Sequence, residues 1–400
     1  MQILLIDDDP LALKLLARQL EHLGCVDVAL CGDASEALTL LETQAETIRM
    51  VFCDLQMPDI DGVEIVRHLA RIRYRGSLVL ISGEDGRILQ TAHKLAQAHS
   101  IHALGAMQKP ISLEQLRQVL ASDARRSAAP ARPAHRPCAP DELRRAIARG
   151  ELVNHYQPKV DLASGAPSGV ETLVRWQHPQ AGLVFPDRFV AMAEECGLID
   201  DLTRAVLAGA LRQARLWRDS GLQLQVAVNV SMDNLAALDF PDVVAQLATE
   251  AGVALSSLTL EVTESRLMKD ARAPLDILAR FRLKHVGLSI DDFGTGHSSL
   301  AQLRDIPFDE LKLDRSFVHG AADDSSLKAI VEGILAMARQ LGMKTVAEGV
   351  EDRADWDLLR DLGCDVAQGY FIARPMPGGD LPGWLAAWEQ RRREMMAASP

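Results

Sequence analysis

The sequence lacks several features that would place the chain in a membrane or outside the cell. No uncharged apolar run in its 400 residues approaches the roughly 18 residues of a membrane-spanning helix, and the N-terminus has no basic signal-peptide region. The six cysteines form no Cys-x-x-Cys pair and have no histidine nearby at metal-ligand spacing, so we expect reduced thiols. These absences predict a cytoplasmic protein without a membrane span, a disulfide framework or a zinc site.

Positive charge is also scarce, because 43 Lys and Arg residues stand against 55 Asp and Glu residues and the net charge is -12. This balance argues against DNA binding and against an anionic membrane surface, but not against a small phosphorylated ligand held by local cations. Apolar residues make up 48% of the chain, which is enough for sizeable cores, and the length predicts two domains.

In the first part of the chain, apolar runs of strand length each end in a polar residue. These ends are Asp7 and Asp8, Asp54, Ser82 and Lys109. Helical patterns separate the runs, so a parallel sheet is predicted, with these side chains at its carboxyl edge. Helix capping by Asp9 explains part of the acidic cluster, but not three carboxylates together with a hydroxyl and a lysine. The arrangement predicts a site for a cation and a phosphate.

Residues 1–121 resemble a response-regulator receiver domain, which implies a flavodoxin-like (βα)5 fold and a sensor histidine kinase as partner. The resemblance implies that the phosphorylated residue is Asp54, the Mg²⁺ ligands are Asp7 and Asp8, the switch hydroxyl is Ser82 and the phosphate-holding lysine is Lys109. Ala106 departs from the family pattern, which usually has Tyr or Phe three residues before the lysine. We therefore expect no aromatic rotamer switch and an output through another surface.

Residues 122–140 are rich in Ala, Pro and Arg and have no apolar periodicity, which predicts a semi-stiff, solvated linker. Its arginines fit either a nucleic-acid arm or a cationic tether between two acidic domains, and composition favours the tether. The second domain is assigned to residues 141–390 and a C-terminal tail to residues 391–400.

The second domain repeats an apolar strand, a polar residue at its end and an amphipathic helix. The clearest instance is residues 286–300, where an apolar run ends in Asp291 and Asp292 and continues into a glycine-bearing loop. Adjacent strand residues point to opposite faces, so one carboxylate is placed to face a central site and the other to hold a second cation at the rim. Capping of the next helix is the alternative interpretation. About eight such strands predict a TIM-like (β/α)8 barrel with its site at the strand ends.

Four acids and one amide are expected to converge from four strands at that end of the barrel. They are Glu171, Asn229, Glu261, Asp291 and Asp292. Any one of them alone is better explained by a salt bridge or a helix cap, but their joint placement favours a site. Clustered acids stay ionised only beside cations, and oxygen ligands with one amide favour Mg²⁺ or Mn²⁺ over zinc. Two cations bridged by a carboxylate and a water are the usual device for cleaving phosphodiesters.

Residues 141 to about 388 resemble the EAL phosphodiesterase family, whose naming tripeptide appears here as Glu171-Thr172-Leu173. The resemblance implies that Glu171, Asn229, Glu261 and Asp291 hold one metal and that Asp291 and Asp292 hold a second. It assigns catalytic roles to Glu171, Lys312, Glu348 and Asp292, and substrate contacts to Gln157, Leu173, Arg175 and Gln368. The implied reaction opens cyclic di-GMP to pGpG with two Mg²⁺ or Mn²⁺ ions.

The resemblance also implies a lid loop at the rim of the site. Its residues are Glu264, which anchors the loop, and Phe293, Gly294, Thr295, Gly296 and His297. His297 stands where the family usually has Tyr, and we interpret it as a tolerated substitution rather than a catalytic group. The alternative is that His297 makes the order of the loop sensitive to pH near neutrality. Phosphorylation of Asp54 is hypothesised to order this loop and complete the second metal site.

Three functions fit these residues. The first is a cyclic di-GMP phosphodiesterase regulated by phosphorylation, the second a catalytically silent module that senses the dinucleotide, and the third an adaptor that competes for a sensor kinase. Retention of every metal ligand and of Lys312 favours the enzyme. No GGDEF-type cyclase signature is present, so synthesis of the dinucleotide is not expected. Because barrels of this family commonly pair, a homodimer or higher homo-oligomer is expected.

Overall fold

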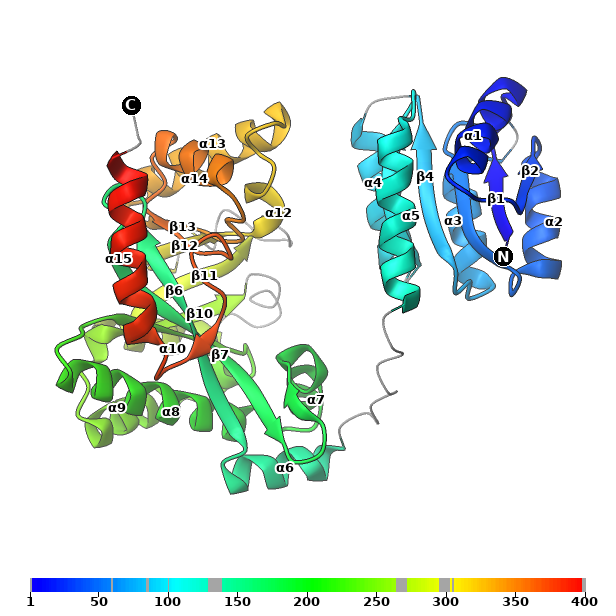
Figure 1. Ribbon diagram of the computed structural model, residues 1–400. Helices are drawn as coiled ribbons and strands as arrows, with labels where there is room; N and C mark the ends of the chain where they lie inside the picture. Colours follow the sequence, from blue (N-terminus) through cyan, green and yellow to red (C-terminus); the bar gives the residue numbers. More distant parts are fainter. Residues whose placement is uncertain are drawn as a thin grey trace. The chain divides into compact units, whose positions relative to one another are not determined.

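The computed structural model describes residues 2–58, 60–83, 86–99, 101–128, 139–263, 272–294, 303 and 306–397. The chain divides into two compact units, Met1–Ala134 and His135–Pro400, each of which is described by itself (Figure 1). Among the described residues, no helix combines the length and the apolar character needed to cross a membrane.

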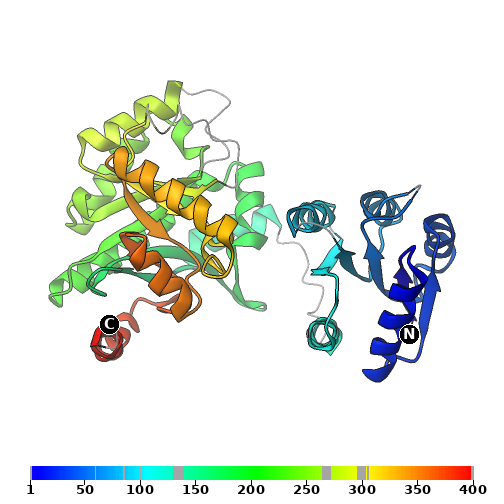
Figure 2. The ribbon, with the colours of Figure 1, turned by 90° about the horizontal axis from the view of Figure 1, so that it is seen from above.

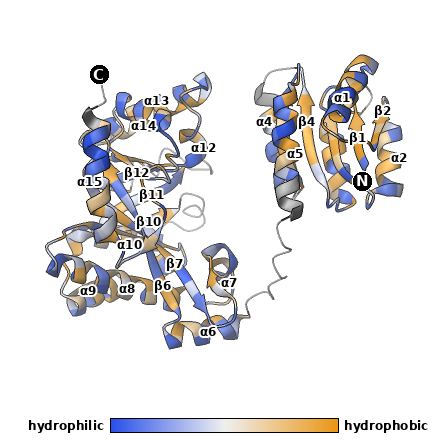
Figure 3. Ribbon diagram, in the orientation of Figure 1, coloured by the Kyte–Doolittle hydropathy of each residue, from blue (hydrophilic) through white to orange (hydrophobic). Residues whose placement is uncertain are grey.

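The first unit is built on a five-stranded parallel sheet with the strand order β2-β1-β3-β4-β5. The strands are β1 (Gln2–Ile6), β2 (Val28–Cys31), β3 (Ile48–Asp54), β4 (Ser77–Ser82) and β5 (His102–Gln108). The central strands are apolar and buried, and β1 and β4 are mostly orange in the hydropathy view (Figure 3). This order is that of the flavodoxin-like folds, so the predicted fold class is confirmed.

Five helices cover both faces of this sheet. They are α1 (Pro10–His22), α2 (Ala34–Gln44), α3 (Gly62–Arg71), α4 (Gly86–Ala98) and α5 (Leu113–Ala128). One core cluster joins α1 and α5 to the sheet, and another joins α2, α3 and α4 to the opposite face (Figure 2). The Asp9 carboxylate accepts a hydrogen bond from the Leu11 amide at 2.8 Å, which is the helix cap that the sequence predicts.

Helix α5 continues past the domain boundary that the sequence analysis assigns. Residues 122–128, predicted as linker, are helical. The cause is Asp123, whose buried carboxylate accepts a hydrogen bond from Ser77 Oγ at 2.7 Å and forms an ion pair with Arg49. These contacts hold the end of the helix against the sheet. Residues 129–138 of the predicted linker lie outside the described residues.

The second unit is a closed barrel. The strand order is β6-β14-β13-β12-β11-β10-β9-β7, and β6 pairs with β7 to complete the ring. The strands are β6 (Leu152–Asp161), β7 (Pro167–His178), β9 (Gln225–Val230), β10 (Leu258–Thr263), β11 (Gly287–Phe293), β12 (Glu310–Leu313), β13 (Lys344–Ala347) and β14 (Val366–Ala367). Two short strands pair antiparallel with members of the ring: β8 (Gly182–Val184) with β7, and β15 (Met376–Pro377) with β6. The barrel prediction is confirmed.

One strand departs from an all-parallel barrel. Strand β6 runs antiparallel to both of its neighbours, β7 and β14, whereas the other neighbouring strands of the ring pair in parallel. Leu152 at the start of β6 is paired with Trp176 near the end of β7. The beginning of β6 therefore lies at the end of the barrel where the other strands finish.

Helices surround the barrel and bury its outward side chains. They are α6 (Pro140–Arg149), α7 (Val190–Glu195), α8 (Ile199–Asp219), α9 (Phe240–Ala251), α10 (Arg272–Leu283), α12 (Arg315–Val318), α13 (Ser325–Gln340), α14 (Arg353–Asp361) and α15 (Leu381–Ala397). Helix α15 includes residues 391–397, which the sequence analysis assigns to a tail. The helix continues because Trp388 and Met395 are buried in the barrel's core cluster.

Candidate functional site

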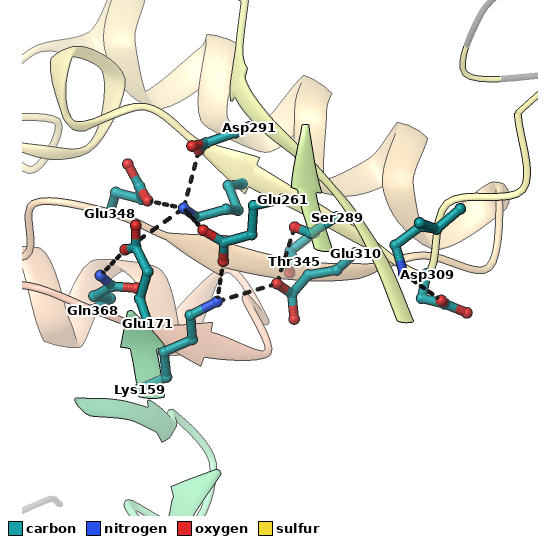
Figure 4. A network of polar contacts seen from close by, with 12 residues as sticks. Lys159, Glu171, Glu261, Ser289, Asp291, Asp309, Glu310, Thr345, Glu348 and Gln368 are labelled. Carbon is teal, nitrogen blue, oxygen red and sulfur yellow. Dashed lines mark hydrogen bonds and ion pairs between the residues drawn. The ribbon is translucent and has the colours of Figure 1, made fainter. Parts of the chain in front are cut away.

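Polar side chains from successive strands meet inside one end of the barrel. Along β10, Leu260 and Val262 pack in the apolar core around the ring, while Glu261 between them joins this polar network (Figure 4). The network comprises Glu171 on β7, Asn229 on β9, Glu261 on β10, Asp291 on β11, Lys312 on β12, and Glu348 and Gln368 just after β13 and β14. As the sequence analysis predicts, Glu171, Asn229, Glu261 and Asp291 come from four different strands.

The centre of the cluster is the ammonium group of Lys312, which is 1% exposed. Its Nζ lies 2.6 Å from Glu348 Oε1, 2.9 Å from Glu261 Oε2, 3.0 Å from Asp291 Oδ1 and 3.7 Å from Glu171 Oε2. Burial alone lowers the pKa of Lys312, but the surrounding carboxylates outweigh burial and raise it well above its ordinary value. Lys312 is therefore a cation at neutral pH.

Two amide side chains hold Glu171 from the other side. Asn229 Nδ2 donates to Glu171 Oε1 at 2.8 Å, and Gln368 Nε2 donates to Glu171 Oε2 at 2.5 Å and to Gln157 Oε1 at 3.0 Å. Gln157 in turn donates to the carbonyl of Ala373 at 3.0 Å. One predicted substrate contact, Gln368, thus lies directly against a predicted metal ligand, and another, Gln157, is linked to that ligand through Gln368.

Burial and neighbouring charges shift the pKa values of the clustered acids apart. Burial raises the pKa of Glu171. Burial also raises the pKa of Glu348, to about 8, because the negative charges of Asp291 and Glu171 act in the same direction and Lys312 offsets only part of the rise. Burial also acts to raise the pKa of Glu261, but Lys159 and Lys312 together reverse this effect and lower it to about 2. Glu261 is therefore ionised throughout the neutral range, whereas Glu348 is poised to exchange a proton there.

The donor set fits hard divalent cations. Carboxylate oxygens of Asp291, Asp292 and Glu348 lie within 4.8 Å of one another. Of the four predicted ligands of the other metal, the three acids Glu171, Glu261 and Asp291 surround one cationic group, the ammonium of Lys312, and the fourth, Asn229, donates to Glu171. All of these ligand atoms are oxygens, which Mg²⁺ and Mn²⁺ prefer.

The end of β11 leaves the strand conformation at Asp292, which has a left-handed φ of 54°, followed by Gly294 with φ 94°. The Asp292 amide donates to Asp291 Oδ1 at 2.9 Å, and this bend brings both carboxylates to the same site rather than to opposite faces. Phe293 is buried. The other predicted lid residues, Glu264, Thr295, Gly296 and His297, lie outside the described residues.

A cavity of about 260 Å³ opens onto the cluster. Its walls include Gln157, Glu171, Leu173, Asp291, Glu348 and Gln368. Arg175 lies nearby with its guanidinium 4.8 Å from the centre of the Phe185 ring. Leu173 and Arg175 are the other two predicted substrate contacts, and both lie on β7, two and four residues after Glu171.

The predicted residues of the first unit also meet at one sheet edge. Lys109 Nζ lies 2.7 Å from Asp7 Oδ2 and 2.7 Å from Asp54 Oδ2, and oxygens of Asp7, Asp8 and Asp54 lie within 4.8 Å of one another. Burial raises the pKa of Asp54, and Lys109 offsets part of this rise. The buried Ser82 ends the neighbouring strand β4, and its carbonyl accepts the Lys109 amide at 2.8 Å. Ala106 is exposed on β5.

Sequence reasoning missed a second polar layer of the barrel, formed by Lys159 on β6, Ser289 on β11 and Glu310 on β12. These residues do not stand at the carboxyl ends of parallel strands, so the strand-end rule does not select them. The available signal was the spacing of Gln157 and Lys159, which puts both side chains on the same face of β6.

Comparisons with known proteins match each of the two units to a family. The model of the EAL domain family matches residues 141–375, and the model of the response regulator receiver domain matches residues 3–121. RocR of Pseudomonas aeruginosa, named a cyclic di-GMP phosphodiesterase, is 33% identical over 94% of this chain and 96% of its own length.

A second relative matches a smaller share of the chain. MucR of the same organism is named a bifunctional diguanylate cyclase/cyclic di-GMP phosphodiesterase. It is 47% identical over 60% of this chain, and the match covers about a third (35%) of the length of MucR. A solved structure of the PaMucR phosphodiesterase in complex with c-di-GMP has a TM-score of 0.58 at 47% identity and covers 60% of this chain and 98% of that chain.

Proposed function

The chain belongs to the EAL domain family and carries a response regulator receiver domain, and on this premise we propose that it hydrolyses cyclic di-GMP to pGpG under the control of its receiver. The observation that carries the proposal is the convergence of all the predicted metal ligands and of Lys312 at one end of the barrel. The names of RocR and of the PaMucR complex support the substrate.

The chain's own residues account for the remaining requirements of phosphodiester cleavage. Two Mg²⁺ or Mn²⁺ ions, held by Glu171, Asn229, Glu261, Asp291 and Asp292, supply a nucleophilic water and neutralise phosphoryl charge when bound. Glu348 lines the cavity 2.6 Å from the Lys312 ammonium group, and its carboxylate is placed there to accept the proton of the attacking water. Lys312 stays cationic and offsets the charge that develops on phosphorus.

Substrate orientation is proposed for the residues that line the cavity. Gln157 and Gln368 present amides beside Glu171, and Leu173 lines the same cavity. Arg175 offers a planar guanidinium fork to a phosphate or to a guanine edge, and its stack on Phe185 limits the directions in which that fork points.

Hydrolysis by the purified protein in Mg²⁺ or Mn²⁺ tests the enzyme directly. We expect metal-dependent formation of pGpG, lost by at least a thousandfold in Glu171→Ala and kept in Glu195→Ala, which removes an exposed acid outside the site. Tight binding of cyclic di-GMP by wild type without any product would instead make the chain a silent sensor.

Control by the receiver is proposed to begin with phosphorylation of Asp54, with Mg²⁺ held by Asp7 and Asp8 and the new phosphoryl group held by Lys109. Acetyl phosphate should change kcat for cyclic di-GMP in wild type but not in Asp54→Asn. Loss of biological output in Asp54→Ala but not in Glu171→Ala would favour the adaptor that competes for a sensor kinase. A cytoplasmic location and self-association into a dimer or larger oligomer belong to the same proposal, and light scattering checks the latter.

A further inference from the structure

A buried lysine that the proposed mechanism does not use lies directly beneath the cluster. Lys159 on β6 is 5% exposed, and its Nζ lies 2.6 Å from Glu261 Oε1 and 3.4 Å from Glu310 Oε1. Ser289 Oγ donates to the same Glu310 oxygen at 3.0 Å (Figure 4). Lys159 is thus held between Glu261 above it and Glu310 beside it.

The two oxygens of Glu261 are divided between two lysines. Oε1 accepts from Lys159, and Oε2 accepts from Lys312 at 2.9 Å in the centre of the cluster. Because the carboxylate is fully buried and one oxygen is fixed from below, rotation about its last bond would break the short contact to Lys159. The other oxygen therefore stays directed into the cluster, where Glu261 is expected to ligate a cation.

A purely structural ion pair is the competing explanation. Buried pairs contribute little net stability compared with apolar residues of similar size, so stability alone is a weak reason for a lysine here. The barrel wall is otherwise rich in apolar side chains, and Lys159 contacts an expected metal ligand rather than a remote acid. Partners that orient metal ligands in this way typically change metal affinity by about 10–100-fold when they are removed.

We propose that Lys159 is a positioning residue of the hydrolytic site, which fixes one oxygen of Glu261 so that the other faces the cation. This inference rests on the proposed function of the same site. It assigns the lysine of β6, the single antiparallel strand of the ring, a role in metal binding rather than in contact with substrate.

The test measures Mn²⁺ binding without substrate, by calorimetry on the full chain. An Asp8→Asn background removes an expected ligand of the receiver site, so that the barrel dominates the signal. Lys159→Met is expected to weaken Mn²⁺ binding by about tenfold or more, and KM for cyclic di-GMP at saturating metal should change less than twofold. Arg282→Met, which breaks a 2.6 Å ion pair to Asp309 outside the cluster, is the matched control and should leave the Mn²⁺ affinity unchanged.

A double-variant cycle separates positioning from general stability. In Glu261→Gln, adding Lys159→Met should cause little further loss of Mn²⁺ affinity, because the contact that Lys159 orients has already changed. A folded Lys159→Met protein whose Mn²⁺ affinity lies within twofold of wild type would overturn the proposal, and so would an undiminished loss in the Glu261→Gln background. Lys159→Gln, which keeps a donor without the charge, is measured if Lys159→Met does not fold. Because binding is measured without turnover, an inactive wild type that binds Mn²⁺ would reject the enzyme and not the role of Lys159.

Discussion

Glu261 and Glu348 contact the same ammonium group, yet their pKa values move in opposite directions. The difference lies in their other neighbours. Glu261 has a second lysine, Lys159, in contact with its Oε1, whereas Glu348 has the acids Asp291 and Glu171 nearby. A single residue's environment therefore decides which acid is permanently charged and which is able to exchange a proton.

This difference predicts how the metal-free protein responds to pH. The carboxyl of Glu348 has an ordinary pKa of 4.5 and a pKa of about 8 when folded, so the folded state binds the proton more tightly. Its contribution to the free energy of unfolding therefore falls as pH rises from 4.5 to 8. Glu348→Gln should raise the Tm of the metal-free barrel at pH 8 by several degrees, at roughly 2–4 °C per kcal/mol, and change it little at about pH 4.5. An equal change in Tm at both pH values, measured by calorimetry in EDTA, would contradict this assignment.

A second prediction concerns a buried hydroxyl beside Glu171. Thr172 Oγ1 is buried and has no hydrogen-bond partner in the described part of the chain, whereas the buried Thr203 Oγ1 donates to Asn234 at 3.0 Å. Thr172→Val should therefore leave the free energy of unfolding unchanged or raise it by about 1 kcal/mol, because an unpaired polar group is removed. Thr203→Val, the matched control, should lower it by about 1–2 kcal/mol. Equal destabilisation of the two variants in urea titrations would show that Thr172 has a partner.

Among the elements, strand ends were the most predictable feature. A run of apolar residues that ends in Glu171 or Asp291 predicts both a strand and the location of the acid, because parallel strands finish at the same edge. The direction of β6 was not predictable in this way, because a strand has the same pattern of apolar residues whether it runs parallel or antiparallel to its neighbours. Lys159 was missed for that reason, and the end of α5 was missed because its stabilising contact, Asp123 with Ser77 and Arg49, is distant in sequence.

The bend that ends β11 predicts the effect of a small substitution. Gly294 has φ 94°, and a Cβ there would lie 2.9 Å from the Phe317 ring, so Gly294→Ala strains the segment just after Asp292. We expect a cost of about 1–2 kcal/mol from the backbone angle and a fall in kcat of tenfold or more from displacement of Asp292. Gly333→Ala in α13, where an added Cβ meets nothing within 4 Å, should keep wild-type kcat and stabilise the helix by about 1 kcal/mol. Wild-type kcat in Gly294→Ala would exclude this role for the bend.

At the scale of the whole molecule, the chain has separate hydrophobic cores. Two core clusters lie entirely within residues 3–119, and the third lies entirely within residues 143–395. Each unit therefore buries its own apolar surface and is expected to unfold as its own cooperative transition.

Ligand linkage tests this independence. With Mg²⁺ held constant, pGpG at about 100 times its Kd should raise the free energy of unfolding of the barrel by about 2.7 kcal/mol and so raise its Tm. The Tm of the receiver should not change. Scanning calorimetry of the full chain distinguishes the two. Movement of both transitions on addition of pGpG would mean that the units unfold together.

The antiparallel direction of β6 also has a consequence for modular design. Because β6 begins where the other strands finish, the chain enters the ring of strands at its reactive end. The C-terminal helix leads the other way, since Trp388 and Arg392 donate to the carbonyls of Gly165 and Ser164 in the turn that joins β6 to β7 at the opposite end. Exchanging the module that precedes α6 therefore offers a route to new input signals, whereas a tag after α15 serves for purification and imaging.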